Sequence, residues 1–148
     1  MKGKITTAAI VGLAAFTACY STLRAQSSAH SVWDGIYTAD QAKRGQALYN
    51  QHCAHCHGDT LGGGEMAPPL AGGNFLSNWN GLSVGDLFER TRISMPQDKP
   101  GKLSREVNAD VLAYVFSMNQ FPAGQTEMPK AAEILKDIMI EPSKSDKK

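Results

Sequence analysis

Two cysteines and two histidines lie within the segment Cys53-Ala54-His55-Cys56-His57. The spacing C-x-x-C-H is the pattern for covalent attachment of a c-type haem. Two thiols on one helical turn can each add across a vinyl group of the same porphyrin and form a thioether. The histidine directly after the second cysteine then lies under the ring, where its Nε2 can bind the iron. The motif therefore predicts one covalent haem c, attached through Cys53 and Cys56, with His57 as an axial iron ligand.

Two other uses of a cysteine pair compete with this prediction. A structural zinc site needs four ligands, usually from two separated pairs, and this is the only pair outside the first 25 residues. The nearby His52 and His55 crowd beside the cysteines and do not form a second pair. A redox-active C-x-x-C site is expected within a βαβ pattern, which does not surround this one. Haem attachment is therefore favoured over both.

The sixth ligand of the iron decides what such a haem does. A thioether gives a saturated iron that can only pass electrons, whereas an open position allows catalysis or gas binding. Met95 is the favoured ligand because it follows a predicted helix, precedes a proline and stands 38 residues after His57, enough chain to cross to the other haem face. His30 is the best alternative. The other methionines are expected beside the motif, in the core or in the tail: Met66, Met118, Met128 and Met139.

The stretch from Met66 to Gly73, MAPPLAGG, is too rich in proline and glycine for a helix or a strand. Such a segment can run along the histidine side of a haem. A backbone carbonyl there could accept the Nδ1–H of His57, which fixes the tautomer of the ligand and raises its basicity. We predict that Pro68 supplies this carbonyl, with Pro69 as the alternative.

Capping residues and apolar periodicity predict an all-α fold without internal repeats. Thr38 begins a capping-box pattern that opens a helix running into the haem motif. Ser83 is expected to cap a helix over residues 84–93, and Ser104 to cap a helix to about residue 119. A short amphipathic helix is expected within residues 131–138. In the first helix, Gly45 either lets another backbone come close or is a tolerated surface glycine.

Residues 1–25 have the features of a cleaved export signal. Two lysines precede an apolar run of 14 residues from Ile5 to Ala18, which is short for a membrane span. A second interpretation starts from Cys19, because FTAC loosely resembles a lipoprotein cleavage box and would leave the protein tethered by a lipid. A retained anchor helix is a third. The remaining chain is expected to form three parts: an N-terminal arm (26–37), a haem domain (38–122) and a C-terminal extension with a short helix and charged tail (123–148).

Charge and cysteine content restrict the function further. The net charge of the whole chain is +1 and falls to −2 without residues 1–25, which carry three basic residues and no acidic ones. A weakly acidic chain does not favour nucleic acid, which binds basic surfaces. The haem would use both remaining cysteines, so no structural disulfide is left. The export signal and the haem motif agree on a place outside the cytoplasm, and we predict the periplasm.

Four segments, CAHCH, APPLAG, ISMP and LSREVNADVLAYVFSMNQFP, together resemble class I cytochromes c of bacteria over residues 38–122. The resemblance implies three to five helices wrapped around one haem, with the first and last helices crossing at Gly45, Tyr49 and Tyr114. It implies the same roles for Pro68 and Met95. It also implies that a tryptophan bonds a haem propionate. Trp79 looks similar to that tryptophan, although it could equally be a partly buried apolar residue, and Asn74 is a weaker candidate. The extension from residue 123 and the missing ring of lysines depart from familiar members.

These observations predict a periplasmic mono-haem cytochrome c that shuttles single electrons and is not an enzyme. Its partners would be redox proteins, such as a dehydrogenase, an oxidase or another cytochrome, and it would act on no soluble small molecule. Membrane contact is expected only through a lipid on Cys19. One alternative is a haem subunit stably bound to a dehydrogenase or oxidase through the apolar stripe of residues 125–140. The other is a catalytic or gas-sensing haem with an open sixth position.

Overall fold

The computed structural model describes residues 31–144, so the predictions for residues 1–25, for Cys19, for His30 and for residues 145–148 lie outside the described part. The described chain is helical and forms no strand, only isolated bridges. This confirms the all-α prediction. None of its helices is long and apolar enough to cross a membrane. The helices are η1 (Val32–Asp34), α1 (Ala39–His52), α2 (Ala54–His57), α3 (Gly73–Trp79), α4 (Val84–Ser94), α5 (Arg105–Met118) and α6 (Ala132–Leu135).

The three long helices begin where their capping residues predict. The hydroxyl of Thr38 accepts the backbone N–H of Gln41 at 3.1 Å, and that of Ser104 accepts the N–H of Val107 at 3.2 Å. At α4, Ser83 and Asp86 form a full capping box. At α1 the box is only half formed, because the buried Gln41 side chain turns to the backbone of the C-terminal extension instead.

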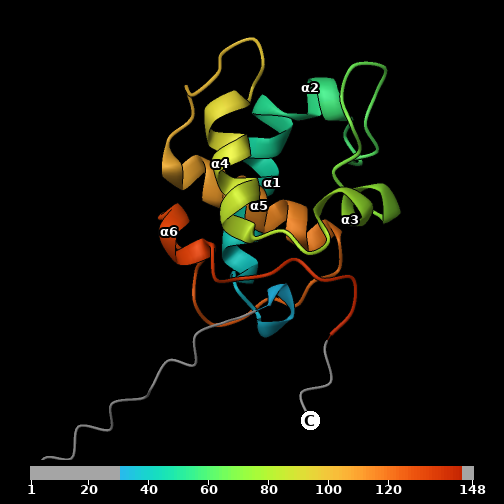
Figure 1. Ribbon diagram of the computed structural model, residues 1–148. Coiled ribbons are helices and arrows are strands. Elements are labelled where there is room, and N and C mark those ends of the chain that lie inside the picture. Colours follow the sequence, from blue (N-terminus) through green and yellow to red (C-terminus); the bar gives the residue numbers. More distant parts are fainter. Residues whose placement is uncertain (1–30, 145–148) are drawn as a thin grey trace, which may run out of the picture.

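Helices α1 and α5 cross near the centre of the molecule (Figure 1) and make its largest helix–helix contact. At the crossing, Gly45 lies against the backbone carbonyl of Asp110, with no space for a Cβ atom. Tyr49 and Tyr114 pack beside it, with ring centroids 5.4 Å apart. Gly45 is therefore a close-approach glycine and not a tolerated surface one.

The C-terminal extension packs into the core of the fold. Its apolar stripe faces inward: Met128, Ala132, Leu135, Ile138 and Ile140 are buried. The segment after α6 runs between η1 and the start of α4 (Figure 1), where it is held by backbone hydrogen bonds. The carbonyl of Met139 accepts the N–H of Val32 at 3.0 Å, and that of Ile138 accepts the N–H of Val84 at 2.8 Å.

Of the smaller points, one expectation was wrong, one is confirmed and one helix was not expected. Met118 was placed in the core, but it is 39% exposed because it lies in the last turn of α5, beyond the contact with α1. The short helix expected within residues 131–138 is confirmed as α6, a single turn that packs against α4. Helix α3 was not predicted at all; it has no side-chain cap at its start, and it buries only Phe75.

Candidate haem-binding site

The two cysteines of the motif lie on one turn of backbone. Cys53 ends α1 and begins α2, and its carbonyl accepts the N–H groups of Cys56 at 3.2 Å and of His57 at 3.0 Å. Residues three apart on such a turn share one face. Both thiols are free, with Cys53 half-buried and Cys56 exposed. The pair can therefore present two thiols to one planar group.

Burial of Cys53 affects its protonation. Burial, and then the neighbouring Cys56, raise the pKa of Cys53 to about 11. This thiol is therefore neutral at pH 7 before any group is attached to it. Within residues 31–144, no three His, Cys, Asp or Glu side chains are grouped to hold a metal ion.

The imidazole of His57 is buried and oriented by one hydrogen bond. Its Nδ1 lies 2.8 Å from the carbonyl oxygen of Pro68, the residue predicted for this contact. A carbonyl can only accept, so the ring proton is on Nδ1 and the lone pair is on Nε2. That is the tautomer that an axial iron ligand requires.

The loop that brings Pro68 to His57 is folded back tightly on the motif. Gly63 donates its N–H to the carbonyl of His57 at 2.8 Å, and Gly64 donates to Ala67 at 2.9 Å. Gly63 has a φ of +80°, and a Cβ there would come within 2.7 Å of the Pro69 nitrogen. Only glycine fits this turn, which fixes the loop beside the imidazole.

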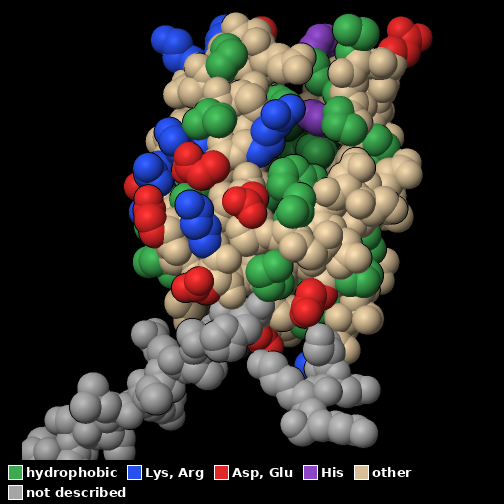
Figure 2. Space-filling view, viewed as in Figure 1, with side chains coloured by type: hydrophobic (Ala, Val, Ile, Leu, Met, Phe, Trp, Pro, Cys, Tyr) green, Lys and Arg blue, Asp and Glu red, His purple; other side chains and the backbone are tan. Residues whose placement is uncertain are grey.

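Met95 lies just after α4, at the end of the molecule where α2 also lies. Its N–H donates to Thr91 at 3.0 Å, its backbone is extended, and its peptide bond to Pro96 is cis. The side chain is half-buried. Figure 1 places the loop that starts here opposite α2, and Figure 2 shows a hollow between α4 and residues 58–72, where hydrophobic side chains and a histidine are visible. The role of Met95 as an iron ligand stays a prediction.

A family model described as cytochrome C oxidase, cbb3-type, subunit III, matches residues 40–115, just over half of the chain. The chain belongs to this family. The match confirms the resemblance to class I mono-haem cytochromes c, the all-α cytochrome fold and covalent haem c as the cofactor. Comparisons with curated proteins and with solved structures gave no match.

The residues of this cytochrome fit the haem that its family binds. Two thiols on one turn, an imidazole with a fixed tautomer and a thioether at the end of α4 are the donors that covalent haem c uses. When bound, the haem supplies an iron that gains and loses one electron. The cytochrome is therefore an electron-transfer protein.

The other predicted site residues of the cytochrome lie as follows. Trp79 ends α3 and is half-buried against the core, while Asn74 is exposed. The propionate contact of Trp79 stays a prediction. Among the methionines, Met66 is 90% exposed, whereas Met128 is 2% exposed and tied by its backbone to Gln41. Neither position favours a ligand, and Met95 remains the best candidate.

Sequence reasoning missed two contacts that support the site. The hydroxyl of Tyr49 donates to the carbonyl of Gly58 at 2.7 Å, which ties α1 to the end of α2. Burial raises the pKa of Tyr49, so it stays a neutral donor. The side chain of Asn119 bonds to the loop of residues 58–72. An asparagine at a helix end is an ordinary cap, so no sequence signal distinguishes it.

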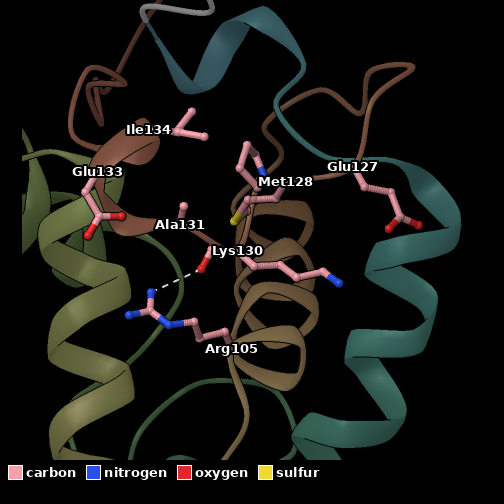
Figure 3. A pocket seen from close by; sticks show the side chains of 8 residues that line it. Arg105, Glu127, Met128, Lys130, Ala131, Glu133 and Ile134 are labelled. Carbon is pink, nitrogen blue, oxygen red and sulfur yellow. Dashed lines mark hydrogen bonds between the residues drawn. The ribbon is translucent and has the colours of Figure 1, made fainter.

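An open pocket lies elsewhere, beside the C-terminal extension (Figure 3). It contains none of the predicted haem residues. Arg105 donates to the carbonyl of Lys130 across it at 3.3 Å, and Lys130 pairs with Glu106 at 3.0 Å. This pocket lies where α5 meets the extension, and the haem chemistry lies at the other end of the fold. Its remaining lining residues are Glu127, Met128, Pro129, Ala131, Glu133 and Ile134.

Proposed function

We propose that this protein carries single electrons between redox proteins in the periplasm. Cys53 and Cys56 would hold one haem c, and His57 and Met95 would bind its iron. The observation that carries the proposal is the hydrogen bond of 2.8 Å from Nδ1 of His57 to the carbonyl of Pro68. It directs the Nε2 lone pair away from the loop and makes it a stronger donor to iron.

Each ligand has a distinct part in the proposed transfer. His57 and Met95 would both hold the iron, so the one-electron chemistry that the haem supplies would need no bond to break. The thioether of Met95 is a weak donor that favours the ferrous state and raises the reduction potential. Cys56 is exposed, so a partner can approach the edge that it attaches. Contacts of this kind between redox proteins are small and brief.

The location is proposed from residues 1–25 and from the haem motif. A positive start and a short apolar run favour export, and covalent haem c attachment agrees with a place outside the cytoplasm. A lipid on Cys19 would tether the same protein to a membrane. The intact mass of the exported protein tests these options together, because it reports the cleavage site, the lipid and the haem.

The visible spectrum of the purified holoprotein tests the ligands. We expect a weak red charge-transfer band from methionine bound to ferric iron and slow binding of CO to the ferrous form. An absent band together with fast CO binding would contradict the proposal, and it would favour a catalytic or sensing haem with an open position.

A second candidate is a haem subunit bound stably to an oxidase. The description of the matching family, which names an oxidase subunit, favours it. The apolar stripe of the extension offers it little support, because most of that stripe is buried inside this chain. Purification of the tagged full chain from washed membranes separates the two candidates. Co-purification with oxidase activity at high salt supports the subunit, whereas release as a monomer supports the carrier.

A further inference from the structure

One side chain at the end of α5 holds the loop that orients His57. Asn119 donates from Nδ2 to the carbonyl of Leu70 at 2.9 Å, and its Oδ1 accepts the N–H of Gly72 at 2.9 Å. The same Nδ2 also donates to the carbonyl of Val115 at 2.8 Å, which fixes the amide group on its own helix. The amide therefore joins two backbone groups of the loop to the C-terminal end of α5.

The two contacts of Asn119 lie two and four residues after Pro68, whose carbonyl accepts from His57. Pro69 stands between Pro68 and Leu70, and consecutive prolines have φ angles locked by their rings. This stretch cannot bend freely, so a displacement at Leu70 moves the carbonyl of Pro68. One further backbone bond, from Leu70 N–H to the carbonyl of Leu61 at 2.8 Å, holds the same point.

We propose that Asn119 is a positioning residue that keeps the Pro68 carbonyl on Nδ1 of His57 and thereby lowers the reduction potential of the iron. The proposal rests on the ligand role proposed above for His57. A hydrogen bond on Nδ1 makes the imidazole a stronger donor, and a stronger donor stabilises the ferric state. Loosening the carbonyl therefore raises the potential.

The sign of the change separates this role from a structural one. If loss of Asn119 only opened the haem pocket, water would enter and stabilise the more highly charged ferric iron. The potential would then fall, because haem exposure lowers it. Positioning predicts a rise, and general loosening predicts a fall.

The test uses the holoprotein with Asn119→Leu, which keeps the branching of asparagine but has no polar group. Ser117→Ala is the matched control: it lies in the same last turn of α5, and its hydroxyl donates to the carbonyl of Tyr114 at 2.7 Å, within the helix. We expect Asn119→Leu to raise the midpoint potential and to speed exchange of the His57 Nδ1 proton several-fold, as measured by NMR of the ferrous protein. Ser117→Ala should leave both at their wild-type values. If Asn119→Leu yields no holoprotein, Asn119→Ala is measured in the same way.

The exchange rate of the Gly72 amide proton shows whether its hydrogen bond to Asn119 is broken. If that rate rises while the potential is unchanged or falls, or while the His57 proton exchanges as in the wild type, the proposal is overturned. Failure of the proposed function would appear elsewhere, as a wild-type spectrum without histidine and methionine ligation, and it needs no variant of Asn119.

Discussion

The backbone carbonyl of Asp110 in α5 lies directly against the Cα atom of Gly45 in α1. This close approach sets the distance between the two helices that frame the haem site. Cys53 follows α1 directly, and Asn119 follows α5. Both the attachment motif and the loop that orients His57 therefore depend on how these helices cross.

Gly45→Ala is expected to destabilise the holoprotein by about 2–3 kcal/mol. The added methyl group would meet the carbonyl and force the helices apart, which outweighs the better helix propensity of alanine, about 1 kcal/mol. Chemical denaturation followed by circular dichroism measures the change. Gly73→Ala is the control, because a Cβ there meets nothing within 4 Å, and it should be neutral or slightly stabilising. If the two variants were equally stable, the close approach would not exist.

The packing of the C-terminal extension against the rest of the fold can be tested with two neighbouring residues of α6. Leu135 is fully buried, whereas Ile134 is 58% exposed. Leu135→Ala should cost about 2–5 kcal/mol of unfolding free energy because it leaves a cavity. Ile134→Ala should change it by about 0.5 kcal/mol or less. Small effects from both would mean that the extension does not pack on the domain in solution.

Met95→Ala tests the sixth ligand. We expect the red band of the ferric protein to disappear, the midpoint potential to fall and CO to bind faster, because the thioether is lost and its position opens. Met66→Ala is the control, since the Met66 side chain is 90% exposed. A Met95→Ala spectrum identical to that of the wild type would exclude Met95 as the ligand.

The parts of the fold that could be predicted are those fixed by neighbouring residues. Thr38, Ser83 and Ser104 cap helices through groups three residues away, so the sequence contains both partners of each contact. The bond from His57 to Pro68 spans only 11 residues, within one loop.

The parts that were missed depend on distant partners. An apolar stripe shows that a face is buried, but not what covers it, so one alternative interpretation made the stripe of residues 125–140 a docking face for another protein. The stripe packs inside this chain: α6 lies against α4, and the residues that follow α6 bond to Val32 and Val84. The contacts of Asn119 with Leu70 and Gly72 span 49 and 47 residues, and only the folded chain brings them together.

The pH dependence of stability offers a last test, at Tyr37. This residue is buried, and its hydroxyl donates to the carbonyl of Phe121 at 2.6 Å. Burial raises the pKa of Tyr37 above its usual value near 10. The folded state therefore keeps this proton to a higher pH than the unfolded state does. The contribution to stability is complete below about pH 10 and is lost as the pH rises through the folded pKa.

Tyr37→Phe should cost about 1–2 kcal/mol at pH 7, because it leaves the buried carbonyl of Phe121 without its donor. It also removes the titrating group, so the stability of the variant should fall less steeply above pH 10 than that of the wild type. The difference in unfolding free energy between the wild type and the variant should therefore become smaller above pH 10. Urea denaturation of both proteins between pH 7 and pH 11 measures this difference. If this free-energy difference stays constant over that range, Tyr37 has the same pKa in the folded and unfolded states.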